Sequence, residues 1–129
     1  MKMINVRLGT NDLARARAFY DATFGALGLP ACTTPSEYPM IMYKIPGGPN
    51  FMLGSARDGQ PTTHANGGTI LFEADSAEQV AAWHAAGLAN GGTCEGAPEA
   101  KAQARGAFGA YLRDPDGNKL GAYHGLAMG

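Results

Sequence analysis

The strongest constraint on this chain of 129 residues is a repeat in the order of its predicted elements. Alternating apolar residues predict strands over 3–9 and over 68–74. A helix follows each strand, over about 12–27 in the first half and from Ser76 in the second. Asn11 is the predicted cap of the first helix, and Ser76 begins a capping-box pattern. A chain with this pattern is expected to fold as two similar modules.

The two halves can be aligned residue by residue. An offset of 64 places Asn5 on Thr69, and an offset of 69 places Phe51 on Leu120. Shorter strands complete each half, and they are predicted over 31–34, 38–45 and 49–54, then over 93–95, 107–113 and 118–124. Two βαβββ modules are therefore the simplest interpretation.

The predicted fold class is α+β, with two main helices and eight strands in a single domain. Module one spans about 1–55, a linker about 56–66 and module two about 67–126. Modules of about 60 residues bury too little apolar surface to be stable alone, so we expect a shared core. Each helix is expected on the outer face of its sheet. The remaining sheet faces are expected to enclose a shared central cavity.

Composition and charge exclude several classes of partner. The formal net charge is −1 and the ten Lys and Arg residues do not cluster, so we expect no nucleic-acid partner and no membrane surface. No apolar run approaches the roughly 20 residues that span a bilayer. The first helix cap stands too close to the N-terminus for a signal peptide, which predicts a cytoplasmic protein. Cys32 and Cys94 are then expected to be reduced and inert, since neither has a neighbouring base in the sequence.

Two segments near the ends of the chain carry a family resemblance. Residues 9–21 read GTNDLARARAFYD, and residues 111–120 read YLRDPDGNKL. They resemble the opening strand-to-helix segment and the closing hairpin of the vicinal oxygen chelate superfamily of glyoxalases, bleomycin-resistance proteins and dioxygenases. The Pro and Gly of the hairpin also suit a tight turn, so we expect its role to be structural. The resemblance implies the two-module fold, but one fold hosts many chemistries.

Enzymes of this superfamily hold one divalent metal ion through inward-facing positions on four strands, usually occupied by His, Glu or Gln. The resemblance places three of these positions on Asn5, Thr69 and Gly121, and the fourth, which is a ligand in only some members, on Met52. Divalent cations of this kind favour carboxylate and imidazole donors. The four positions here offer an amide, a thioether, a hydroxyl and no side chain. We therefore expect no metal and no other cofactor, unless the protein is an enzyme with a displaced metal.

The histidines do not supply an obvious replacement for these ligands. His64 lies in the linker, His84 lies at the edge of the apolar face of the second helix, and His124 points away from the cavity by strand parity. Glu73 shares the parity of Thr69, but one carboxylate does not make a metal site. All three histidines are interpreted as surface residues or as hydrogen-bonded polar residues.

Strand parity predicts the residues that line the cavity. They are Asn5, Arg7, Met40, Met42, Met52, Thr69, Leu71, Glu73, Tyr111, Gly121 and Tyr123. The methionines would form an adaptable apolar wall, and the Asn, Arg and Tyr side chains would supply polar contacts. The competing interpretation is that the cavity has collapsed and that these residues only pack.

Three functions remain compatible with the sequence. The leading hypothesis is a metal-independent small-molecule-binding protein, similar to the bleomycin-resistance branch, with an unknown ligand. The alternative is a metal-dependent lyase, isomerase, thioltransferase or dioxygenase of the glyoxalase type. A third hypothesis is a dimeric scaffold without a ligand. Superfamily members pair two modules within a chain or across a dimer, and the exposed strand edges predict a homodimer here.

Overall fold

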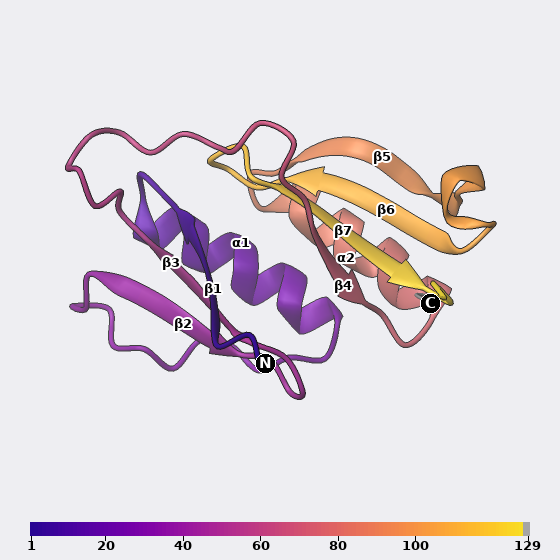
Figure 1. Ribbon diagram of the computed structural model, residues 1–129, viewed down its shortest axis with the longest axis horizontal. Helices are drawn as coiled ribbons and strands as arrows, with labels where there is room; N and C mark the ends of the chain where they lie inside the picture. The colour runs from indigo at the N-terminus through magenta and orange to yellow at the C-terminus, as the bar shows by residue number, and fades with distance from the viewer. Residues whose placement is uncertain (128–129) are drawn as a thin grey trace.

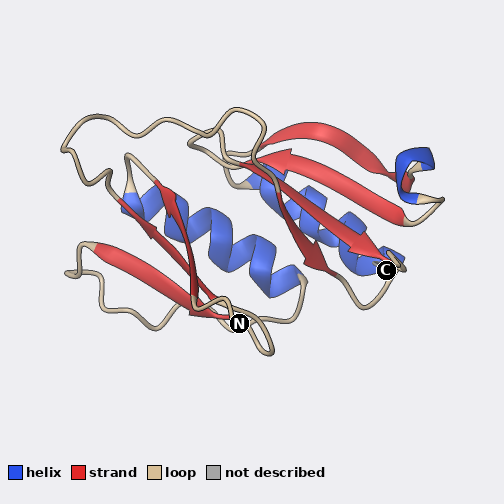
Figure 2. Ribbon diagram, in the orientation of Figure 1, coloured by secondary structure: helices blue, strands red, loops and turns tan. Residues whose placement is uncertain are grey.

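The computed structural model describes residues 1–127, which form two long helices, seven strands and one short 3₁₀ helix (Figure 1). The elements are β1 (Asn5–Gly9), α1 (Leu13–Ala26), β2 (Met40–Lys44), β3 (Asn50–Gly54), β4 (Ile70–Glu73), α2 (Ala77–Ala89), β5 (Thr93–Ala100), η1 (Ala102–Ala104), β6 (Phe108–Arg113) and β7 (Lys119–His124). Strands and helices contribute to both halves of the molecule, which confirms the predicted α+β class (Figure 2). None of the described helices is long and apolar enough to cross a bilayer.

The two sheets repeat one pairing pattern. The first sheet has the order β1-β3-β2 and the second has the order β4-β7-β6-β5. In the first sheet Arg7 lies opposite Met52 in a parallel pair. In the second sheet Leu71 lies opposite Gly121 in a parallel pair. The offsets of 64 and 69 relate one pair to the other, so the alignment of the two halves is confirmed at the level of register.

The helix starts follow local capping chemistry. The side chain of Asp12, one residue later than predicted, caps α1 by accepting a hydrogen bond from Arg15 N at 3.0 Å. The Asn11 side chain instead donates to the backbone oxygen of Thr62 in the linker and accepts from Thr62 N. Ser76 caps α2 by accepting a hydrogen bond from Gln79 N, and Gln79 Oε1 accepts from the backbone N–H of Asp75, one residue before the position that the predicted capping box requires.

Two predicted strands differ from the structure. Residues 31–34 form no strand, because side chains satisfy their backbone in place of a β-ladder. The Asp21 carboxylate accepts from Cys32 N at 2.9 Å, and the Arg17 guanidinium donates to the backbone oxygen of Thr34. The strand predicted over 93–95 extends to Ala100 as the irregular edge strand β5, which tolerates a proline and shifts of register.

One apolar core joins the two modules. The ring of Phe24 in α1 lies 5.3 Å from Phe51 of the first sheet and 5.2 Å from Phe72 of the second, centroid to centroid. The two helices contact each other, and Figure 1 shows α1 between β1 and β4. The helix-facing sides of both sheets therefore meet inside a single chain. This differs from the expected placement of both helices on the outside of a shared cavity.

The closing hairpin fastens module two to module one. Asp114 accepts a hydrogen bond from the Tyr20 hydroxyl at 2.5 Å and from the backbone N–H groups of Asp116 and Asn118. The side-chain amide of Asn118 donates to the backbone oxygen of Gly9. Burial, together with the neighbouring Asp114 carboxylate, raises the pKa of Tyr20 well above its usual value. The hairpin is therefore structural, as expected, and it also joins the modules.

Candidate functional site

The first-module candidates lie on the face of the three-stranded sheet that α1 does not cover. They are Asn5, Arg7, Met40, Met42 and Met52. The three methionines are half-buried, whereas Asn5 and Arg7 are exposed. Arg7 Nη2 donates to the backbone oxygen of Ser55 at 2.7 Å, which holds the guanidinium along the sheet. This face is a flexible apolar surface with a cation at its edge.

The second-module candidates lie on the uncovered face of the four-stranded sheet. They are Leu71, Glu73, Tyr111, Gly121 and Tyr123, with Thr69 directly before β4. The hydroxyl oxygens of Tyr111 and Tyr123 lie 2.7 Å apart, and their rings meet edge to face. Burial raises the pKa of Tyr123 to about 12, and the hydrogen bond to Tyr111 adds to this shift. The pair therefore offers a hydrogen-bonding group that lies between Leu71 on one side and polar and charged side chains on the other.

Gly121 marks the point where the second face is closed. A Cβ at this position would come within 2.6 Å of Leu71 Cδ2 and 2.9 Å of Tyr111 Cε1. The space that a longer side chain would need is thus filled by two neighbouring side chains. Leu71 is itself 44% exposed, so it forms a lid over the glycine and also part of the surface.

The residues at the four ligand positions of the superfamily do not fit a divalent metal. Asn5 and Met52 lie on the first sheet, Thr69 and Gly121 belong to the second module, and none of them is a carboxylate or an imidazole. A ligand at position 121 would also collide with Leu71. Within residues 1–127, no three His, Cys, Asp or Glu side chains gather in a way that could hold a metal ion.

The histidines occupy three unrelated places. His64 of the linker lies over the hairpin glycine Gly117, and His124 Nδ1 lies 3.2 Å from the backbone oxygen of Ala74. His84 is buried against Cys94, a contact that the sequence did not suggest.

The candidates come together as two groups, one on each sheet. The hollow over the second sheet measures about 420 Å³, and its lining comes wholly from module two. It includes Thr69, Leu71 and Tyr111 among the predicted residues. Each candidate face is the side of its sheet that points away from the helices. The helix-facing sides of both sheets form the shared core. Within one chain, the first-module candidates therefore do not line this hollow.

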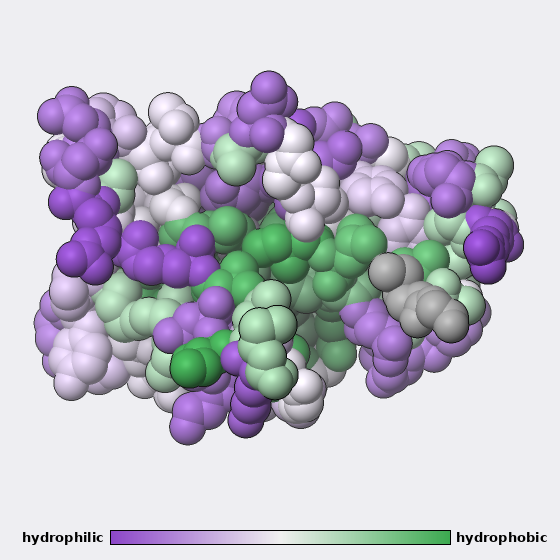
Figure 3. Space-filling view, viewed as in Figure 1, coloured by the Kyte–Doolittle hydropathy of each residue, from purple (hydrophilic) through white to green (hydrophobic). Residues whose placement is uncertain are grey.

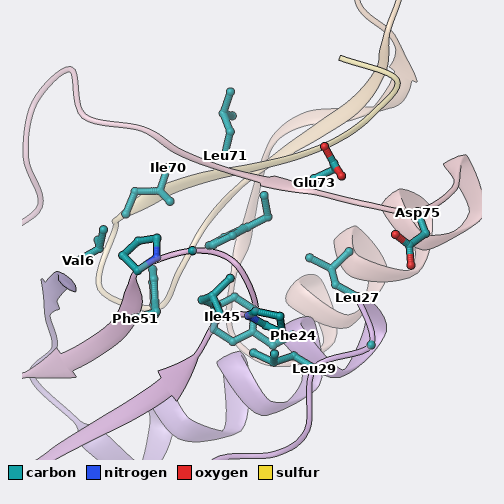
Figure 4. Close-up of a pocket in the computed structure, with 15 residues that line it drawn as sticks. Val6, Phe24, Leu27, Leu29, Ile45, Phe51, Ile70, Leu71, Glu73 and Asp75 are labelled. Carbon is teal, nitrogen blue, oxygen red and sulfur yellow. The ribbon is translucent and has the colours of Figure 1, made fainter. Parts of the chain in front are cut away.

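A larger groove of about 590 Å³ lies at the seam between the modules (Figure 4). Its apolar lining comes from both modules and includes Val6, Leu29, Ile45, Phe51, Ile70 and Phe72. Figure 3 shows apolar side chains gathered across the middle of this face of the molecule. In Figure 4, Leu71 projects to the other side of β4 from Phe51 and Ile45. Leu71 and Glu73 are the two predicted cavity residues that also border the groove, whereas the rest of its lining was not predicted by strand parity.

Sequence reasoning also missed the cations beside the second face. Lys119 Nζ lies 5.2 Å from the centre of the Tyr111 ring. Lys119 has the same strand parity as Gly121, so the alternation that selected Gly121 could have found it. Lys101 and Gln103 also line the hollow. Gln103 lies within η1 and Lys101 directly before it, and a helix this short gives no periodic signal in the sequence.

A family model for the Glyoxalase/Bleomycin resistance protein/Dioxygenase superfamily matches residues 2–121. The chain belongs to this superfamily. A solved glyoxalase/bleomycin resistance protein from Albidiferax ferrireducens T118 is 45% identical, with a TM-score of 0.85 over 95% of this chain and 98% of that one. The comparison with curated proteins gives no match.

More distant members of the superfamily share the fold. Lactoylglutathione lyase from Agrobacterium tumefaciens is 25% identical, with a TM-score of 0.64 over 96% of this chain and 93% of that one. A glyoxalase-related enzyme from Fulvimarina pelagi is 19% identical, with a TM-score of 0.78 over 96% of this chain and 88% of that one. The superfamily therefore contains enzymes as well as resistance proteins, and membership alone leaves the activity open.

Proposed function

We propose that this superfamily member binds a small, largely apolar molecule without a metal ion. The observation that carries the proposal is the state of position 121, where a metal ligand is usual. Gly121 has no donor atom, and Leu71 and Tyr111 fill the space above it. A binding protein needs a shaped apolar surface with a few polar groups, and it needs no Lewis acid.

The two candidate faces supply complementary chemistry for such a ligand. Met40, Met42 and Met52 offer a polarizable wall that adapts to different shapes. On the other sheet, the Tyr111–Tyr123 hydroxyl pair offers a fixed hydrogen-bonding point, and Lys119 places a positive charge beside it. These contacts favour an apolar body that carries one hydrogen-bonding or anionic group.

We further propose that the binding cavity forms in a homodimer. The two faces belong to different sheets, and each lies opposite the shared core of its own chain. A second copy related by a twofold axis could place the first-module face of one chain opposite the second-module face of the other. The apolar groove at the seam is a further surface whose exposure in a single chain is costly, and we propose that the partner chain covers it as well.

Assembly is tested with one groove variant and one matched control. Ile45→Glu places a charge in the apolar groove, whereas Leu88→Glu places the same charge on an exposed part of α2 outside the groove lining. Sedimentation velocity should show a dimer for the wild type and for Leu88→Glu, and a monomer for Ile45→Glu. A wild-type protein that is monomeric over a wide concentration range would overturn the dimer.

Ligand binding is tested by thermal unfolding against a panel of apolar carboxylic acids and phenols, with EDTA present throughout. A ligand at about 100 times its Kd should stabilise the folded protein by about 2.7 kcal/mol. Met42→Lys and Tyr123→Phe should each weaken the effect, because they alter opposite walls of the proposed cavity. A parallel series replaces EDTA with a divalent metal, and stabilisation that appears only in that series would contradict the proposal and favour an enzyme.

A further inference from the structure

Helix α2 and strand β5 bring a histidine and a cysteine together outside the candidate cavity. His84 Nε2 lies 3.1 Å from Cys94 Sγ, within hydrogen-bonding distance for a sulfur atom. Cys94 pairs with Leu112, and Leu112 packs against Gly87 of α2. The contact therefore lies on the helix side of the second sheet, opposite the face that carries Tyr111.

The burial of the two partners is unequal. His84 is only 8% exposed, so its ring is held in place by the surrounding protein. Cys94 is exposed on β5, which is the edge strand of its sheet. A reagent in solution can therefore reach the sulfur atom while the imidazole stays fixed behind it. This combination of a fixed base and an accessible thiol is the arrangement that activates nucleophilic cysteines.

The electrostatic surroundings keep the imidazole neutral. Burial lowers the pKa of His84 below its ordinary value, and the positive charge of Lys101 lowers it further. Lys101 Nζ is itself held by the backbone oxygen of Ala97 at 2.7 Å and by the Glu99 carboxylate at 3.3 Å. At neutral pH, the tautomer with its proton on Nδ1 leaves Nε2 free to accept the thiol proton.

The second cysteine provides an internal comparison. Cys32 is half-buried, and its sulfur atom lies 3.6 Å from the backbone oxygen of Met42 and 3.4 Å from the backbone nitrogen of Thr34. These are backbone contacts, which offer no titratable base. The two thiols of the chain should therefore differ in reactivity.

We propose that Cys94 is a reactive thiol that undergoes exchange with low-molecular-weight disulfides, with His84 as its base. The thiol proton moves from Sγ to Nε2 as the sulfur attacks one sulfur of the disulfide. The bond between the two reagent sulfurs breaks, and the leaving thiolate takes the proton from His84. The products are a mixed disulfide at Cys94 and one free small thiol, so atoms and electrons balance. A thiol in excess reverses the reaction by the same steps.

The experiment measures the reaction of the reduced protein with 4,4′-dithiodipyridine at pH 7 under stopped flow. Two phases of equal amplitude are expected, and peptide mass spectrometry should place the fast one at Cys94. Cys94→Ser should remove the fast phase, whereas Cys32→Ser should leave it. His84→Gln should slow it by about tenfold to a hundredfold, since a positioned base is worth at least that much. Urea should make the two wild-type thiols react alike.

The pH profile separates a base from a merely structural histidine, and the wild-type profile alone can overturn the proposal. In the wild type, the fast rate should rise as pH increases through the lowered pKa of His84, below 6.5, and then level off. His84→Gln should lose this step and rise only near the ordinary thiol ionisation, about 8.5. Equal rates for the two native thiols, or a wild-type profile without the lower step, would overturn the proposal.

Discussion

The uncovered faces of the two sheets share one backbone register and differ in almost every side chain. Met52 and Gly121 are equivalent positions, each opposite a residue of the first strand of its module. Met52 contributes to a soft, half-buried wall, whereas Gly121 lies beneath Leu71 and Tyr111. One face is therefore adaptable and the other is pre-organised. The two modules therefore share a backbone arrangement while their side chains give each uncovered face a different chemistry.

The two equivalent turns differ in the same way. The first-half turn around Pro46 makes a local backbone bond between Gly48 and Ile45, and it borders the groove. The second-half hairpin carries Asp114, whose carboxylate is buried in a network that reaches Tyr20 of module one. Only the second turn joins the modules, so the stability of the whole chain should depend on it far more.

The largest expected effect comes from removing that carboxylate. Asp114→Ala leaves the Tyr20 hydroxyl and two backbone N–H groups without their buried acceptor, and it should cost about 3 kcal/mol or more. Pro46→Ala at the equivalent turn should cost no more than about 1 kcal/mol. Urea unfolding measures both. If the two variants lost equal free energy of unfolding, the two turns would not differ in their importance for stability.

A smaller effect is expected where the second face is closed. Gly121→Ala puts a methyl group into the space of Leu71 and Tyr111, and overpacking of this kind costs about 1–3 kcal/mol. Met52→Leu at the equivalent first-module position conserves volume and should cost less than about 1.5 kcal/mol. If Gly121→Ala proved neutral in unfolding experiments, the second face would be open rather than filled.

The smallest effect is the share of the alkaline pH dependence that Tyr123 contributes. The pKa of Tyr123 is raised from 10.0 to about 12 in the folded protein. Its contribution to stability is therefore complete below pH 10 and is lost as pH rises through about 12. Tyr123→Phe should reduce the loss of stability between these pH values, measured as a difference from the wild type in urea. If the stability of both proteins depended on pH in the same way, Tyr123 would not contribute to the loss of stability at high pH.

The fold was predictable because its signals are local and repeated. Alternating apolar residues identified β1 and β4, and the capping box at Ser76 identified the start of α2. The strand predicted over 31–34 failed because Asp21 and Arg17, both distant in sequence, satisfy that backbone. Periodicity carries no information about such contacts.

The candidate site was predictable only face by face. Parity placed Met42 and Met52 together on one sheet, and Tyr111 and Tyr123 together on the other. Parity describes one sheet at a time, so it could not show that the helix-facing sides of both sheets share one core. The contact between His84 and Cys94 escaped notice for the same reason, because it depends on how α2 lies across β5.

Metal content tests the central claim most directly. The protein should be purified reduced, incubated with excess zinc or nickel, freed of loosely bound ions and analysed for elements. The neutral donors at positions 5, 52 and 69, with no donor at 121, should retain less than about a tenth of a metal ion per chain. Near-stoichiometric metal, with anomalous scattering beside Asn5 or Gly121 in a crystal, would contradict the account and identify the protein as a metal-dependent member of its superfamily.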